Sequence, residues 1–432
     1  MLQRFVFTTL FAIALGATAF AAENGPGQGN GYALVLAHRS PFVQSAMKFL
    51  LHEANQLRDQ VLKHETLDAV SNPQTCVKHR ANLTKEQKSE IIRQLREAGL
   101  ICPDDEAAFI GGAQAGIFPP VLDEETVCPH LPQQFIAAPG SFFGGHHSYP
   151  GGLVVHEAFN EVNNLSVAAD YRMTYGHVNE EGLPAIDLRG EARFGQPDAD
   201  LGINQDLIIA APIWHDWAKT IVFQWKADGS EFEEFNFGGN GRTDNFGEKG
   251  DARTPAHHIL GLAESMKRNL SPELIIAQAS AHAAPTVGDE YKVVDWIRAA
   301  AIVARADPVA RGYLAHDSSG RLRLPPFASL GSFDLWSLSK SDGFFLAEDT
   351  MNNLSDANFR FAVPAVSQTT LILRKFAPTF GIDPDSPALF NNRLRNPVYS
   401  YLSAERLMFI YTKSGVAGVH AQLLHLHELG LI

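Results

Sequence analysis

Apolar residues recur at three- and four-residue spacing along most of the chain, the pattern of helices with one buried face. The predicted helices are Pro41–Gln60, Leu83–Gly99, Gly152–Val167, Gln205–Trp217, Pro272–Ala284, Asp289–Tyr313, Ser403–Ser414 and Val416–Leu429. A further helix is predicted at AHHILGLAESMKRN, where Thr254 and Pro255 are residue types preferred at the N-cap and the first helical position. Few segments alternate apolar and polar residues, so we expect a mainly all-α fold.

The pattern changes character in two places. Residues 102–140 are rich in Pro, Gly and acidic side chains without periodicity, and beyond residue 318 the chain is again punctuated by Pro and Gly. We therefore predict boundaries near residues 135 and 320. They separate an N-terminal helical and irregular extension (23–135), a central helical core (136–320) and a mostly helical C-terminal extension (321–432).

The first 22 residues are typical of a secretory signal peptide. Arg4 precedes an apolar stretch from about Phe5 to Leu15, and the small residues Ala19 and Ala21 have the spacing of a cleavage site. The apolar stretch is shorter than the ~20 residues that a spanning helix needs. We expect a periplasmic or secreted protein with no membrane span after cleavage.

Charge and cysteine content narrow the classes of partner. The net charge of −13 disfavours binding to long nucleic acids or anionic membranes, which needs a basic surface. An oxidising compartment permits one disulfide among Cys76, Cys102 and Cys128, and the sequence leaves the pairing open. We expect a small-molecule substrate, and the oligomeric state stays open.

Each central helix carries a metal-ligand side chain on an otherwise apolar background. In chain order these are His156, His215 with Asp216, His257 or His258, His282 and Asp307. A single His-Asp pair is weak evidence in a chain with 17 histidines, and a second pair, His316-Asp317, lies in a polar stretch to which we assign no role. The ordered set is stronger. Imidazoles with carboxylates suit one or two divalent transition ions such as Fe, Mn, Co or Zn.

The segments that carry these residues resemble the HD superfamily of metal-dependent phosphohydrolases. They are HHSYPGGLVVHE from His146 to Glu157, then WHDWAK, AHHILG, SAHAAP and ARADPVARG. The resemblance covers about residues 145–312 and implies an all-helical HD core. It also implies a ligand set of His156, His215, Asp216, His258, His282 and Asp307. His257 and His258 compete for one ligand position, for which we favour His258. The interval between His156 and His215 is longer than is usual in that family.

The resemblance also implies catalytic roles for three residues. Asp216 is expected to bridge two ions. Lys219 lies three residues later, on the same helical face, and is similar to a lysine that contacts phosphate, although a lysine there could instead offset the helix dipole. His147, which with His146 precedes the ligand helix, is expected either to contact substrate or ligands or to have a structural role.

These residues are compatible with three functions. The first is an exported hydrolase of phosphomonoesters or phosphodiesters, possibly of nucleotides, that uses a metal-activated water. The second is a di-iron oxygenase similar to myo-inositol oxygenase, which uses the same order of ligands. The third is a metal-stabilised binding protein without turnover.

Overall fold

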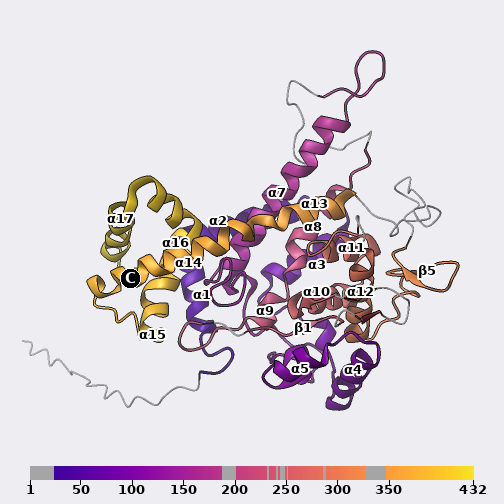
Figure 1. Cartoon of the computed structure of the whole chain (residues 1–432), viewed down its shortest axis with the longest axis horizontal. Helices are drawn as coiled ribbons and strands as arrows, with labels where there is room; N and C mark the ends of the chain where they lie inside the picture. The colour runs from indigo at the N-terminus through magenta and orange to yellow at the C-terminus, as the bar shows by residue number, and fades with distance from the viewer. Residues whose placement is uncertain are drawn as a thin grey trace, which may run out of the picture.

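The computed structural model describes residues 24–186, 201–230, 233–239, 242–243, 249–250, 252–285, 289–325 and 347–432 (Figure 1). The predicted signal peptide and most of the insertion before His215 lie outside these residues. The described part is mainly helical, which confirms the predicted fold class. Its strands are two-residue pairs, and none of its helices is long and apolar enough to cross a bilayer.

The helices follow one another along the whole described chain. The α-helices are α1 (Asn30–Arg39), α2 (Pro41–Ala54), α3 (Gln60–Ser71), α4 (Lys85–Glu97), α5 (Pro103–Ala108), α6 (Gly112–Ile117), α7 (Gly152–Tyr175), α8 (Gln205–His215), α9 (Lys219–Val222), α10 (Ala256–Lys267), α11 (Pro272–Ser280), α12 (Glu290–Ala304), α13 (Ala347–Ser355), α14 (Phe359–Phe376), α15 (Pro387–Phe390), α16 (Asn396–Leu402) and α17 (Ala404–Glu428). A 3-10 turn, η5 (Asp356–Asn358), joins α13 to α14. The strand pairs are β1 (Asn236–Phe237) with β4 (Thr254–Pro255), β2 (Arg242–Thr243) with β3 (Lys249–Gly250), and β5 (Ala315–His316) with β6 (Leu322–Arg323).

Helix α7 packs against helices from the N-terminal, central and C-terminal parts of the chain. It has 24 residues and contacts α2, α8 and α13, while α8 contacts α11 and α10 contacts α12 (Figure 1). Helices α14 and α17 pack together at the opposite end of the molecule from α12 (Figure 1). The buried apolar residues form one cluster from Ala37 to Leu426. The described parts of the chain therefore share one continuous hydrophobic core.

Glycines at the start of α7 bring a loop against the helix. Gly151 adopts a left-handed φ of 84°, which favours glycine. A Cβ on Gly152 would lie 1.8 Å from the carbonyl oxygen of His147, so only glycine fits. These contacts form a tight turn at HHSYPGG before α7, and they place His146 and His147 beside His156.

Local signals predicted several helix ends well. Thr84 forms a capping box with Gln87 at the start of α4. The two helices predicted at the C-terminus form α17, in which non-helical backbone at Gly415 makes a kink between them. Helix α10 differs from the prediction, because Thr254 and Pro255 pair as strand β4 and the helix begins at Ala256. Helix α12 ends earlier than predicted, where Arg305 turns into the left-handed conformation.

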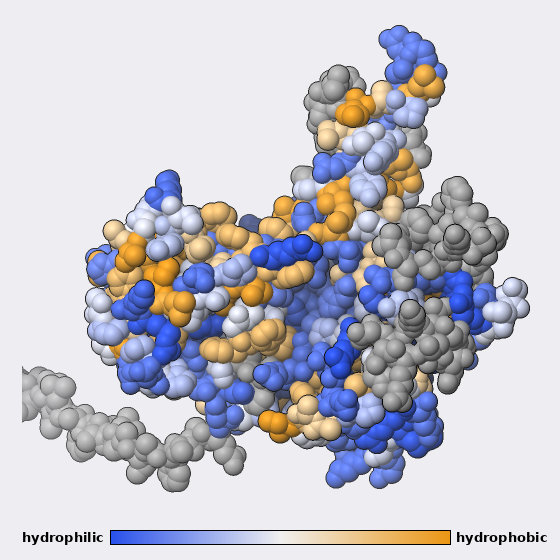
Figure 2. Space-filling view, in the orientation of Figure 1, coloured by the Kyte–Doolittle hydropathy of each residue, from blue (hydrophilic) through white to orange (hydrophobic). Residues whose placement is uncertain are grey.

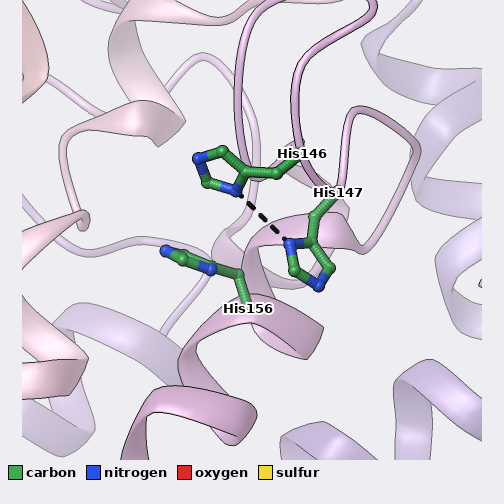
Figure 3. A group of neighbouring side chains, drawn as sticks. All are labelled: His146, His147 and His156. Carbon is green, nitrogen blue, oxygen red and sulfur yellow. Dashed lines mark hydrogen bonds between the residues drawn. The ribbon is translucent and has the colours of Figure 1, made fainter. Parts of the chain in front are cut away.

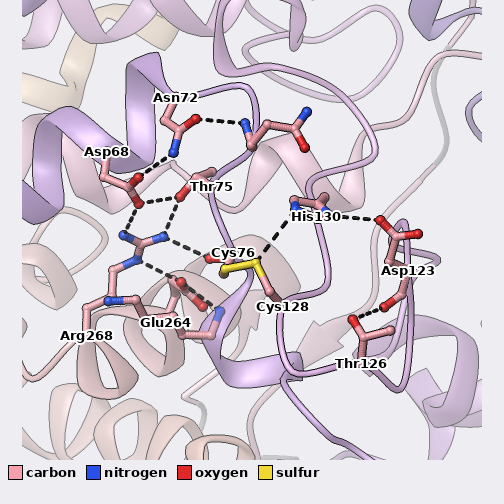
Figure 4. The surroundings of a disulfide bond; sticks show 12 residues. Asp68, Asn72, Thr75, Cys76, Asp123, Thr126, Cys128, His130, Glu264 and Arg268 are labelled. Atoms are coloured by element: carbon pink, nitrogen blue, oxygen red, sulfur yellow. Dashed lines mark hydrogen bonds and ion pairs between the residues drawn. A yellow bond between two sulfur atoms is a disulfide. The ribbon is translucent and has the colours of Figure 1, made fainter.

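A disulfide closes a loop within the N-terminal extension, beside the end of helix α10 in the central part of the chain. Cys76 pairs with Cys128 (Figure 4), and Cys102 is a buried thiol outside the disulfide. Beside the disulfide, Arg268 of α10 donates a hydrogen bond of 2.9 Å to the carbonyl oxygen of Cys76 and one of 2.8 Å to Glu264 (Figure 4). The N-terminal extension is thus tied to the helix that carries His257.

Candidate metal centre

Six histidine and aspartate side chains, Asp216 among them, converge at the floor of a pocket of about 570 Å³. They are His156 from α7, His215 and Asp216 from the end of α8, His257 from α10, His282 after α11 and Asp356 from η5. Figure 2 shows a hydrophilic hollow in the middle of the molecule, beside the helix labelled α13 in Figure 1. The centre is therefore buried, with one open side.

The end of α8 is built to present His215 and Asp216. Pro212 lacks the amide that would bond the carbonyl of Ile208, and Asn164 of α7 donates to that carbonyl instead, at 2.8 Å. Helix α8 ends one turn later at His215, and Asp216 is its C-cap residue. The two side chains can therefore point into the centre from successive positions.

One oxygen of Asp216 faces the first group of ligands. Oδ2 of Asp216 lies 3.1 Å from Nε2 of His156 and 3.4 Å from Nε2 of His215. Oδ1 of Asp356 lies 3.2 Å and 3.7 Å from the same two nitrogens. Two imidazoles and two carboxylates thus surround one position.

The other oxygen of Asp216 faces a second group. Oδ1 of Asp216 lies 2.9 Å from Nε2 of His257, and ligand atoms of Asp216, His257 and His282 all lie within 4.8 Å of one another. Asp216 is shared by both groups. The geometry therefore offers two adjacent cation positions with Asp216 between them.

Hydrogen bonds behind the rings fix which nitrogen faces the centre. Nδ1 of His215 lies 2.7 Å from the carbonyl oxygen of Pro212, which only accepts, so this nitrogen carries the proton. Nδ1 of His257 lies 2.7 Å from Oε2 of Glu234, and Nδ1 of His282 lies 3.1 Å from Oγ1 of Thr254. In His215 and His257 Nε2 is then left with a lone pair, as metal ligation requires, whereas the hydroxyl of Thr254 can either donate to or accept from His282.

The polar atoms that face each other fit a cation. Nε2 of His215, Nε2 of His257 and Oδ1 of Asp216 are buried and have no hydrogen-bond partner among the described residues. Burying such atoms unpaired costs roughly 1–3 kcal/mol each, more for charged groups. A bound ion removes that cost. Imidazole and carboxylate donors suit Fe, Mn, Co or Zn.

The charges of the centre are tightly linked. Burial raises the pKa of Asp216, but His215, Lys219 and His257 outweigh it and hold that pKa well below its ordinary value. Burial lowers the pKa of His215, but Asp216 and Glu157 raise it well above its ordinary value. Burial raises the pKa of Glu157 to about 7. Without an ion, protons on histidine balance the carboxylates, and a bound cation would replace them.

Lys219 extends from α9 to the same carboxylate. Its Nζ donates to Oδ2 of Asp216 and to the carbonyl oxygen of Gly140, and its side chain is buried and lines the pocket. The structure therefore brings predicted Lys219 to the centre. Its other possible role, on the dipole at the end of α8, is compatible with the same position.

Two predicted ligands do not lie at the centre. Nδ1 of His258 lies 2.7 Å from Oγ1 of Thr254, and its ring packs between those of His282 and Trp296. Asp307 is exposed beyond the end of α12, and its Oδ1 accepts bonds from the amides of Val309 and Ala310. His257 and Asp356 occupy the places expected for His258 and Asp307.

Asp356 was missed because the expected order of ligands already ended at Asp307. The available signal was a short polar run, NNLSDANF, in which Asp356 precedes a new apolar periodicity. Asp356 lies beyond residue 320, where the predicted metal-binding core ended. The C-terminal part of the chain therefore contributes a side chain to the centre.

A third histidine cluster adjoins the first position. His146 and His147, on the loop before α7, lie against His156, with ring centroids 4.6 Å and 5.2 Å from it (Figure 3). His146 lines the pocket, whereas predicted His147 lies behind it and is buried. His147 therefore reaches the pocket only through its neighbours.

Comparison with known proteins identifies no relative, because no family model, curated protein or solved structure matches the chain.

Proposed function

We propose that the protein is a metal-dependent phosphohydrolase that acts on a small phosphomonoester or phosphodiester. The observation that carries the proposal is the shared carboxylate of Asp216, which lies between two sets of histidine ligands at the floor of an open pocket. Two ions about 3.5–4 Å apart are a recurrent arrangement in phosphatases. The HD-type order of His156, His215 and Asp216 supports the same class.

The charge of the pocket makes a cation necessary for this substrate. Among the described residues that line it, Asp216, Glu233, Glu234 and Asp356 are acidic and Lys219 is the only lysine or arginine. Such a pocket repels phosphate. One or two divalent ions would reverse the balance and leave Lys219 as an additional contact for a phosphoryl oxygen.

Each group of side chains would have its own role in hydrolysis. Divalent ions held here would polarise a phosphoryl oxygen and lower the pKa of a bound water toward 7. His156, His215, His257, His282 and Asp356 would hold the ions, and Asp216 would be shared between them. Lys219 would orient the phosphoryl group, and the hydrogen bonds that His215 and His257 donate to the Pro212 carbonyl oxygen and to Glu234 keep these two imidazoles in the ligating tautomer.

A di-iron oxygenase is the second candidate, since four imidazoles and two carboxylates with a shared aspartate also suit a pair of irons. The deciding experiment supplies the metal-stripped protein with Mn²⁺, Co²⁺, Zn²⁺ or Fe²⁺ and a panel of phosphomonoesters and phosphodiesters. Metal-dependent phosphate release without oxygen supports the hydrolase. Iron-dependent oxygen consumption on non-phosphorylated polyols, without phosphate release from the panel, would replace it with the oxygenase.

One further experiment, on a variant of His215, distinguishes the hydrolase from a protein that binds metal without turnover. We expect His215→Ala to abolish phosphate release while the far-ultraviolet circular dichroism stays that of the wild type. If no substrate is turned over with any of the four metals, although metal binds, the hydrolase proposal fails and a binding role replaces it.

A further inference from the structure

The loop before α7 brings two imidazole nitrogens together beside the centre. Nδ1 of His146 and Nδ1 of His147 lie 3.3 Å apart, with the rings nearly perpendicular at 83° (Figure 3). Potential ligand atoms of His146, His147 and His156 all lie within 4.8 Å of one another. None of the six ligand roles around Asp216 uses His146 or His147.

The separation of the two nitrogens fits a shared cation. Nitrogens bound to one tetrahedral Zn²⁺ are roughly 3.3 Å apart, because each Zn–N bond is about 2.0–2.1 Å long. Nitrogen-donated hydrogen bonds in proteins are usually shorter, about 2.9–3.0 Å. The pair is therefore spaced as two ligands of one ion are.

A carboxylate behind His147 supports the same assignment. Oε1 of Glu405, on α17, lies 3.4 Å from Nε2 of His147 and has no hydrogen-bond partner among the described residues. A carboxylate facing one ring nitrogen of a ligating histidine is a common arrangement, since it keeps the proton there and the lone pair on the other nitrogen. Glu405 thus favours a lone pair on Nδ1, the atom that faces His146.

The loop is held in place at an energetic cost. His147 adopts a left-handed φ of 50°, which is uncommon for a residue other than glycine. Arg395 braces the next residue through bonds of 2.8 Å to the carbonyl oxygen and to Oγ of Ser148. A strained residue that its surroundings hold in place is typical of functional sites.

One ring nitrogen of His156 still needs a hydrogen-bond partner. Its Nε2 faces Asp216, and its Nδ1 is buried without a hydrogen-bond partner among the described residues. When Nε2 ligates an ion in the main centre, Nδ1 carries a proton and needs an acceptor. A water bound to an ion between His146 and His147 would supply one.

We propose that His146 and His147 bind a further divalent cation through their Nδ1 atoms, next to the two positions that share Asp216. Imidazole ligands and a near-tetrahedral spacing favour Zn²⁺ or Co²⁺. Glu405 is a positioning residue for His147. The ion would be reached from the pocket, because His146 lines it.

The test counts metal in the full chain after stripping with a chelator and reloading with Zn²⁺. His147→Asn and His146→Ala should each bind one ion per chain fewer than the wild type, as measured by inductively coupled plasma mass spectrometry after gel filtration. Asparagine tolerates the left-handed backbone at position 147. The matched control is His316→Ala, an exposed histidine outside the cluster, which should keep the wild-type count.

Reloading with Co²⁺ gives a second readout. The visible absorption of tetrahedral Co²⁺ should decrease in His147→Asn and be unchanged in His316→Ala. Equal metal counts and spectra in the wild type, His146→Ala and His147→Asn would overturn the proposal and leave a hydrogen bond between the two rings. The comparison is independent of turnover, so it can fail while phosphate release succeeds, or succeed while phosphate release fails.

Discussion

Nε2 of His257 lies 2.9 Å from Oδ1 of Asp216, without hydrogen-bond geometry between them. The other oxygen of Asp216 faces His156 and His215. A carboxylate whose two oxygens face different imidazole groups is arranged to bridge two ions. Because this relationship distinguishes His257 from its neighbour His258, it leads directly to a mutational test.

We expect His257→Ala to remove the ion on the Oδ1 side of Asp216. Changes behind a ligand cost roughly 10–100-fold in metal affinity or activity, and loss of the ligand itself should cost at least as much. The matched variant is His258→Ala, whose ring packs between His282 and Trp296 and should affect the unfolding free energy more than the metal count. Metal analysis of both proteins decides, and the assignment fails if His258→Ala loses the ion and His257→Ala keeps it.

Asp356→Asn should weaken the ion on the Oδ2 side. Oδ1 of Asp356 lies 3.2 Å from Nε2 of His156, and an amide oxygen carries no charge to offset a divalent ion. We expect roughly a 10–100-fold loss of affinity, at the scale of other changes around metal sites. Asp307→Asn is the control and should bind metal as the wild type does. The opposite result would return Asp307 to the ligand set.

Lys219→Ala should keep its metal and bind substrate less well. Removing Nζ frees Oδ2 of Asp216 for an ion but removes a cation from the pocket. Hydrogen bonds to charged groups contribute roughly 1.5–3 kcal/mol, which corresponds to a rise in KM of roughly 10–100-fold. Lys48→Ala, at an exposed position on α2, is the control. Loss of metal from Lys219→Ala would show that Lys219 maintains the centre and does not primarily contact substrate.

The Glu264 network should make the fold sensitive to acid. Burial raises the pKa of Glu264, but Arg268 and His79 outweigh it and lower that pKa to about 2 (Figure 4). The unfolded chain, with an ordinary value near 4.5, then binds more protons between pH 4.5 and pH 2, so stability is complete above this window and is lost as the pH falls through it. The loss amounts to about 3 kcal/mol.

Denaturant unfolding of the metal-free protein measures this effect. Glu264→Gln should be less stable than the wild type at pH 7, since it leaves Arg268 with a weaker buried partner, and should lose less stability between pH 4.5 and pH 2. Glu97→Gln, at an exposed position on α4, should follow the wild type. Identical pH dependence in the wild type and Glu264→Gln would contradict the assignment.

Sequence periodicity predicted the helical fold because helices such as α2 and α4 bury one apolar face and begin at a side-chain cap. The structure places His257, and not the favoured His258, against Asp216 for a physical reason. Adjacent residues on a helix diverge by about 100°, so only the rotation of α10 decides which faces the centre. That rotation depends on Glu234 and Trp296, which contact the two rings from distant segments.

Asp307 lies away from the centre for a different reason. Arg305 ends α12 in a left-handed turn, which directs Asp307 to the surface as a cap. The carboxylate at the centre comes instead from Asp356, after a long interval whose path the sequence does not define. Long-range packing of this kind leaves no periodic signal, whereas the ligands on α7 and α8 lie at local, recognisable helix ends.

The most direct measurement is anomalous X-ray diffraction from crystals of the metal-loaded protein. We predict two ions in the centre, one contacted by His156, His215 and Asp356 and the other by His257 and His282, with Asp216 contacting both. An ion bound by His258 or Asp307, or no anomalous peak next to Asp216, would contradict the central claim.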